Sequence, residues 1–77
     1  MSASTAKSYT ITATWDADAG VFTSQSDIPG LVVEAETFEE FVNLVRTLAP
    51  EVIAGNLPAA RGPHMLHVET RFDLAVA

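Results

Sequence analysis

The stretch that decides the fold is Ser26-Asp-Ile-Pro-Gly-Leu-Val-Val-Glu-Ala-Glu-Thr-Phe-Glu-Glu40. It opens on a turn, because Pro29 fixes φ at the first central position and Gly30 accepts the positive φ of a type II turn at the second. The alternation that follows predicts a short strand over residues 31–36. One face of that strand carries Leu31, Val33 and Ala35, and the other carries Val32, Glu34 and Glu36.

A helix is expected to begin where this strand ends. Thr37 and Glu40 form a capping box. The Thr37 hydroxyl accepts from the Glu40 backbone N–H, and the Glu40 carboxylate accepts in return from the Thr37 backbone N–H. Glu39 and Glu40 also lie at the positive end of the helix dipole. Pro50 predicts a kink, or a stop followed by a short turn, and Gly55-Asn56 ends the helical region. The stripe that would pack on a sheet consists of Phe38, Phe41, Val42, Val45, Leu48, Ala49 and Val52.

The sequence before this stretch predicts a hairpin. Residues 8–15 alternate between an apolar face and a threonine face, which is the period of a half-buried strand. The run Asp16-Ala-Asp-Ala-Gly20 follows as a five-residue turn, because Asp favours such turns and Gly20 can take φ > 0. A second strand is expected over residues 21–26. The two faces of the first strand are Tyr9, Ile11, Ala13 and Trp15, and Thr10, Thr12 and Thr14.

The sequence after the helix predicts a loop over residues 57–63 and a long last strand over residues 65–76. In that strand Leu66, Val68, Phe72, Leu74 and Val76 alternate with His67, Glu69, Arg71 and Asp73. The order β-β-β-α-β predicts an α+β domain, in which one helix packs on one face of an antiparallel sheet of about four strands. We expect residues 1–7 to be a disordered tail and residues 8–77 to form the single domain.

Composition narrows the class of protein. A chain of 77 residues allows one domain with a small core, so a dimer or a protein partner is a reasonable expectation. Ten acidic residues face four basic ones, for a formal charge of −6. The basic residues are scattered, so direct DNA binding is not expected. They are Lys7, Arg46, Arg61 and Arg71.

The segments that would send the chain to or across a membrane are not found in this sequence. Residues 1–7 have no apolar core of a signal peptide, and no apolar run reaches the roughly 20 residues that span a bilayer. The chain has no cysteine, which excludes disulfides and is compatible with the cytosol. We therefore expect a cytoplasmic protein with no membrane association.

Several residue types that carry chemistry were weighed against structural roles. Asp16 and Asp18 are paired carboxylates, but a turn-forming and solubilising role is favoured over a metal site. Asp27 could serve as a ligand or a base, and capping of the Pro-Gly turn is favoured. His64 and His67 lie on opposite faces of a strand, which argues against a zinc site. Tyr9, Trp15 and Phe22 could stack on bases, and core packing is favoured because the sheet is acidic.

No enzyme class is indicated. The serine and threonine residues lie on strand faces without a nucleophile elbow, and no Gly-rich phosphate loop is present. We expect no catalytic residue, no metal and no cofactor.

The quoted motifs resemble a known family. Asp27-Ile-Pro-Gly-Leu31 and Glu34-Ala-Glu-Thr37, at their spacing from the hairpin, look like the HicB-like antitoxin group, and closest to a short branch of unknown function. The resemblance covers residues 9–76. It implies a β-β-β-α-β domain, sometimes described as a degraded ribonuclease-H-like fold without catalysis. It also implies that full-length HicB antitoxins block small basic ribonucleases of the HicA type and usually add a C-terminal DNA-binding segment. We expect this chain to lack that segment, because Ala77 directly follows the last predicted strand.

Three hypotheses for function result. The first is a non-catalytic protein-interaction domain, HicB-antitoxin-like, that masks the RNA-binding surface of a small basic toxin with acidic side chains. The second is a self-associating structural domain, a homodimer or higher oligomer paired through the 65–76 strand or the second strand. The third, a minor one, is a degenerate nuclease that uses Asp16 and Asp18. The partner-binding candidates of the first hypothesis are Asp16, Asp18, Glu34, Glu36, Glu39 and Glu40.

Overall fold

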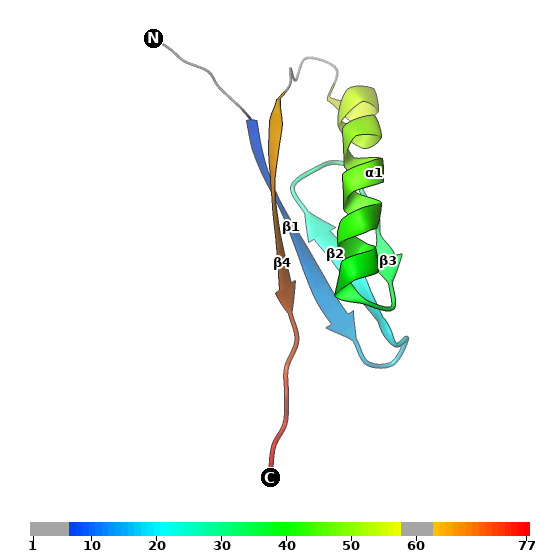
Figure 1. The fold of residues 1–77 in the computed structure, drawn as a ribbon, viewed down its shortest axis with the longest axis vertical. Coiled ribbons are helices and arrows are strands. Elements are labelled where there is room, and N and C mark those ends of the chain that lie inside the picture. Colours follow the sequence, from blue (N-terminus) through cyan, green and yellow to red (C-terminus); the bar gives the residue numbers. More distant parts are fainter. Residues whose placement is uncertain (1–6, 58–62) are drawn as a thin grey trace.

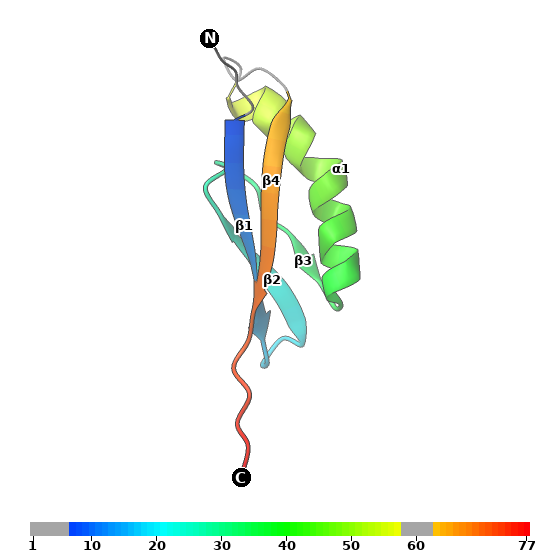
Figure 2. The ribbon, with the colours of Figure 1, turned by 60° about the vertical axis from the view of Figure 1, so that its left-hand side comes forward.

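The computed structural model describes residues 7–57 and 63–77 and contains one sheet covered on one face by a helix (Figures 1 and 2). The elements in chain order are β1 (Lys7–Asp16), β2 (Val21–Ser26), β3 (Glu34–Ala35), α1 (Phe38–Asn56) and β4 (His64–Arg71). The expected α+β fold, with the order β-β-β-α-β, is confirmed. The expected N-terminal tail lies outside the described residues except for Lys7, and so do residues 58–62 of the expected loop.

The sheet is mixed, with the strand order β3-β2-β1-β4. β2 pairs antiparallel with both β1 and β3, whereas β4 pairs parallel with β1 from Lys7–His64 to Thr14–Arg71. The expectation of a fully antiparallel sheet was therefore wrong for β4. The reason is the helix, because α1 carries the chain back to the end of the sheet where β1 begins (Figure 1). A strand that starts there runs in the same direction as β1.

Two strands are shorter than the sequence indicates. β3 keeps only Glu34 and Ala35 of the expected residues 31–36. Leu31 and Val33 are still buried, but the Val33 N–H donates to the Ser24 hydroxyl (2.8 Å) while the Ser24 N–H donates to the Val33 carbonyl (3.1 Å). A side chain thus takes the place of part of the backbone ladder. β4 ends at Arg71, and residues 72–77 continue without a strand partner.

The turns follow the expected chemistry. Leu31 N–H donates to the Ile28 carbonyl (3.2 Å) across the Pro29-Gly30 turn, and Gly30 has φ 84°. The hairpin closes through the Gly20 N–H and the Asp16 carbonyl (2.8 Å), with φ 70° at Gly20. Both glycines therefore occupy the left-handed region that other residues rarely adopt.

The core lies between the sheet and α1. Its helix side consists of Phe41, Val45, Ala49 and Ile53, which lie on the predicted stripe or next to it. Its sheet and loop side consists of Tyr9, Ile11, Ala13, Ile28, Leu31, Val33 and Ala35. No helix in residues 7–57 and 63–77 is long and apolar enough to cross a membrane.

The helix continues through Pro50, so of the two alternatives expected there, a kink or a stop, the stop was wrong; the end at Asn56 agrees with the expectation. Pro50 has no backbone N–H, so the helix carbonyl one turn earlier lacks its usual donor. Because Pro50 is exposed, water can hydrate that carbonyl. Figure 2 shows the axis of α1 changing direction over its last turns, in the part that contains Pro50.

Candidate functional site

A shallow open groove lies beside the short edge strand β3 and the start of α1. Its polar lining is mainly three carboxylates, those of Glu34 in β3, Glu36 in the following bend, and Glu40 in the first turn of α1. Asn43 and the apolar Val21, Ala35 and Leu44 complete the lining. We call this feature the acidic groove.

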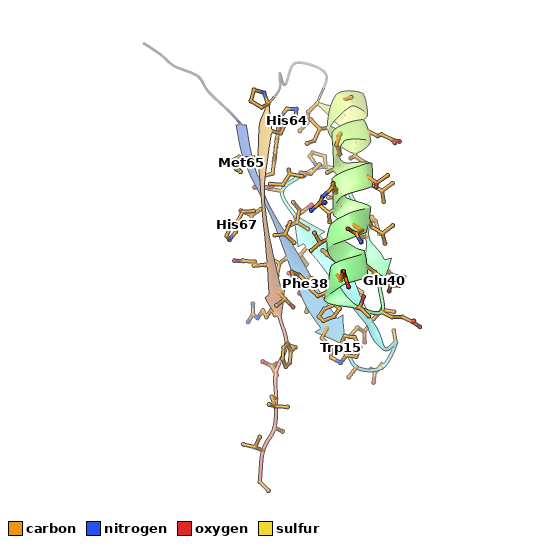
Figure 3. The ribbon with its side chains drawn as sticks, viewed as in Figure 1. Trp15, Phe38, Glu40, His64, Met65 and His67 are labelled. Atoms are coloured by element: carbon orange, nitrogen blue, oxygen red, sulfur yellow. The ribbon has the colours of Figure 1, made fainter. Side chains whose placement is uncertain are left out.

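The sequence-predicted acidic residues are brought to one end of the molecule. Figure 1 shows the β1–β2 turn, which contains Asp16 and Asp18, at the same end as the start of α1. Figure 3 labels Trp15 and Glu40 at that end. Glu39 is exposed beside Glu40 in the first helical turn. Within residues 8–57 and 63–77 no Lys or Arg side chain forms an ion pair with any of these carboxylates.

Some of the acidic side chains also accept hydrogen bonds that stabilise the fold. Asp16 Oδ1 accepts from the backbone N–H groups of Asp18 (3.1 Å) and Ala19 (3.3 Å), which is the favoured turn-forming role. Asp27 Oδ1 accepts from the Thr10 N–H (3.0 Å) and so ties the end of β2 to β1. Capping of the Pro-Gly turn, expected for Asp27, belongs instead to Ser26, whose Oγ accepts from the Ile28 N–H (3.3 Å).

The helix start is fixed by Thr37. Its Oγ1 accepts from the Glu40 N–H at 3.1 Å, the hydroxyl half of the expected capping box. The return bond from the Glu40 carboxylate is not among the hydrogen bonds of the described residues. The Glu40 side chain lines the groove, where its charge faces solvent.

A row of four aromatic rings connects the ends of β1 and β2 to the first turn of α1. Trp15 packs edge-on against Phe22 (4.9 Å between ring centroids), Phe22 against Phe38 (6.2 Å), and Phe38 stacks on Phe41 (6.4 Å). Phe41 is fully buried, whereas Trp15 is 37% exposed. The row anchors the hairpin to the helix start and leaves an amphipathic indole at the surface.

The two histidines do not converge. His64 packs edge-on against Tyr9 (5.9 Å), while His67 lies on the opposite face, where Nε2 is 3.3 Å from Glu69 Oε2. The Tyr9 hydroxyl and His64 Nδ1 are buried without a hydrogen-bond partner among the described residues. No group of three or more His, Cys, Asp or Glu in that part of the chain could hold a metal ion.

Sequence reasoning missed one surface. Residues 72–77 were expected to lie in a strand, yet the apolar side chains among them are exposed: Phe72 by 57%, Leu74 by 76% and Val76 by 82%. The turn at residues 16–20 could have predicted this for residues 74–77, because in the observed register Asp73 would lie opposite Asp16, the last residue of β1. The early end of β4 at Arg71 has no such signal.

Comparison with known proteins places this fold in a family. Residues 8–76 match the model of the domain of unknown function DUF1902. The chain belongs to the DUF1902 family. A similar solved structure is a hypothetical protein from the extremely thermophilic bacterium Thermus thermophilus, which is 34% identical over 91% of this DUF1902 chain and 100% of that chain, with a TM-score of 0.78. No curated protein matches the chain. Function therefore has to be argued from the surface of the domain.

Proposed function

We propose that this DUF1902 domain is a non-catalytic protein-interaction module of the HicB-antitoxin type. Its partner is a small basic protein, such as a ribonuclease toxin of the HicA type, and it acts by covering the partner's RNA-binding face. The observation that carries the proposal is the acidic groove beside β3, which is lined by three glutamates without a Lys or Arg ion pair among the described residues and by the apolar Val21, Ala35 and Leu44.

The groove combines the two contributions that protein docking needs. Exposed carboxylates attract a basic partner over about a Debye length of 8–10 Å and increase the association rate. The apolar side chains Val21, Ala35 and Leu44 then offer surface whose burial stabilises the complex. A lysine or arginine of the partner would reach the carboxylates of Glu34 and Glu36 without losing all of its hydration.

Inhibition in this mechanism is steric and electrostatic. A ribonuclease recognises the RNA backbone through positive charge, and a domain of charge −6 competes with RNA for the same side chains. No step requires a catalytic group, a metal or a cofactor. The exposed Trp15 adds an amphipathic contact at the margin of the same end.

The test begins with affinity capture from native lysate at low and high salt, with bound proteins identified by mass spectrometry. A captured basic protein is then titrated against the wild-type chain and against Glu34→Lys and Glu36→Lys. Each reversal should weaken binding by about 3- to 10-fold, the range of one exposed charge pair turned repulsive. Glu51→Lys, an exposed reversal on α1 outside the groove, is the matched control and should leave the affinity unchanged.

Two results would contradict the proposal. One is binding that keeps its strength when salt is raised, because contacts between exposed charges are screened. The other is an equal loss of affinity in Glu36→Lys and Glu51→Lys, which would place the partner elsewhere on the domain.

A further inference from the structure

The free edge of β4 and the segment that follows it form an unpartnered apolar row. β4 is at the edge of the sheet, next to β1 only. Leu66 and Val68 of β4 pack against the core, and Phe72, Leu74 and Val76 continue the same alternation as exposed side chains. Figures 1 and 2 both show the segment after β4 leaving the sheet and extending past the β1–β2 turn.

Such an edge offers unpaired backbone groups to another strand. Edge strands of stable monomers are normally short, charged, bulged or covered. β4 has eight residues, none of them a proline, and the described chain has no element on its outer side. Three large apolar side chains in one row beside an open edge are typical of a surface that another strand covers.

We propose that two copies of this chain pair antiparallel through β4 and residues 72–77, about a two-fold axis at Thr70. In this register a residue and its partner in the second copy have numbers that add to 140. The tail of each copy then extends the sheet of the other along its β4 edge. The pairs formed are Leu66–Leu74, Val68–Phe72 and Thr70–Thr70 on the helix side, and Met65–Ala75, His67–Asp73 and Glu69–Arg71 on the other side.

The complementarity of these pairs supports the second copy as the occupant. In an antiparallel ladder, directly opposite residues share a face, so Leu66, Val68, Phe72 and Leu74 all meet apolar partners, while Val76 meets His64 at the end of the ladder. On the polar face, Glu69 meets Arg71 of the second copy, and the symmetry repeats the pair. One sequence thus carries both halves of a matching interface, which is what a two-fold contact requires.

Neighbouring registers lose this match. A shift of one residue places apolar side chains opposite polar ones. A shift of two places either Glu69 opposite Glu69 or Arg71 opposite Arg71, and like charges directly opposite each other are destabilising. A shift of four in either direction separates Glu69 from Arg71 and breaks the leucine pair, because Leu66 or Leu74 then lies opposite Thr70.

The resulting dimer would join two four-stranded sheets into one continuous sheet with both helices on the same face. The acidic groove lies beside β3, at the opposite edge of the sheet from β4, so it stays accessible in both copies. The inference therefore does not depend on the proposed function.

The first experiment measures the mass of the full chain in solution over a concentration series. The expected mass is twice the 8.2 kDa of the monomer. Glu69→Arg and Arg71→Glu should each raise the dissociation constant about tenfold, because two attractive pairs become repulsive. The double variant Glu69→Arg/Arg71→Glu restores the pairing and should return to within about threefold of wild type. Glu51→Arg, with the same charge change on α1, is the control that leaves the mass unchanged.

A second experiment places the two-fold axis. The chain has no cysteine, so Thr70→Cys introduces one thiol per copy. Opposite Cβ atoms at the axis lie about 4.5–5.5 Å apart, close to the distance that a disulfide spans. Oxidation should give a covalent dimer for Thr70→Cys and little for the exposed control Thr47→Cys on α1.

Three results would overturn the proposed dimer. A monomer at about 100 µM protein overturns the proposal, since pairing is driven by concentration. A dimer that Glu69→Arg and Glu51→Arg affect equally, or that Thr70→Cys does not cross-link more than Thr47→Cys, also overturns it. Circular dichroism of each variant shows whether the domain itself is still folded.

Discussion

The stability of the Pro-Gly turn depends on a close approach between Gly30 and Asn56 that a single methyl group would disturb. Asn56 Nδ2 donates to the Pro29 carbonyl at 2.9 Å, which ties the end of α1 to the turn. A Cβ built on Gly30 would lie 2.5 Å from that same nitrogen. Gly30→Ala should therefore strain the backbone at φ 84° and displace the amide as well.

Gly20 provides a matched reference for this substitution. It has φ 70°, and a Cβ there would have nothing within 4 Å. Gly20→Ala should cost about 1 kcal/mol, the left-handed penalty of about 1–2 kcal/mol partly offset by the lower entropy of the unfolded chain. Gly30→Ala adds the loss of the Asn56 hydrogen bond, which is worth about 1 kcal/mol. The expected total for Gly30→Ala is about 2 kcal/mol.

Urea unfolding, followed by circular dichroism at one fixed protein concentration, measures both costs. Asn56→Ala removes the displaced amide, and the next atom that the Cβ meets belongs to Val52 at an ordinary 3.8 Å. In the Asn56→Ala background the cost of Gly30→Ala should fall to that of Gly20→Ala, a coupling of about 1 kcal/mol. Equal costs for Gly20→Ala and Gly30→Ala in the wild-type chain, or an excess that persists without Asn56, would refute the reasoning.

Three further substitutions test other parts of the fold by the same unfolding assay. Thr37→Ala removes the helix cap and should cost about 1 kcal/mol, and an unchanged midpoint would show that the cap is dispensable. Ser24→Ala leaves the Val33 N–H without its 2.8 Å acceptor and should cost about 1–3 kcal/mol; an unchanged stability would show that this bond does not hold the loop. Phe41→Ala empties a fully buried site and should cost about 3–5 kcal/mol, against about 1 kcal/mol or less for Leu44→Ala at 38% exposure; similar losses would contradict the assigned core.

The features that the sequence predicted well are those with local causes. The Pro29-Gly30 turn, the Asp16–Gly20 hairpin and the cap at Thr37 each depend on dihedral preferences and hydrogen bonds within a few residues. The helix stripe follows from spacing alone, and Phe41, Val45 and Ala49 are buried as expected. In the candidate site, local charge was enough to nominate Glu34, Glu36 and Glu40.

The features that escaped prediction depend on where distant segments meet. The direction of β4 is set by the end of the sheet to which α1 returns the chain, which no local pattern specifies. β3 is short because the Ser24 hydroxyl takes a bond that the ladder would have made. Residues 72–77 have strand periodicity but no strand partner, since the pairing with β1 ends at Thr14–Arg71 and residues 74–77 would lie beyond Asp16, where β1 ends. The groove could not be predicted either, because it depends on how β3 and α1 are placed relative to each other.

The parallel pairing of β1 with β4 has a consequence for the order of folding. The hairpin joins Asp16 to Val21, five positions apart, whereas the Thr70 hydroxyl reaches the Ala13 carbonyl across 57 positions. Closing the longer loop costs about 2 kcal/mol more in chain entropy, since the cost grows as the logarithm of loop length. β1 should therefore pair with β2 early in folding, and with β4 only after α1 has formed. During synthesis on the ribosome, one side of β1 remains open until β4 has been made, and during this interval the domain is most exposed to misassociation and to chaperones.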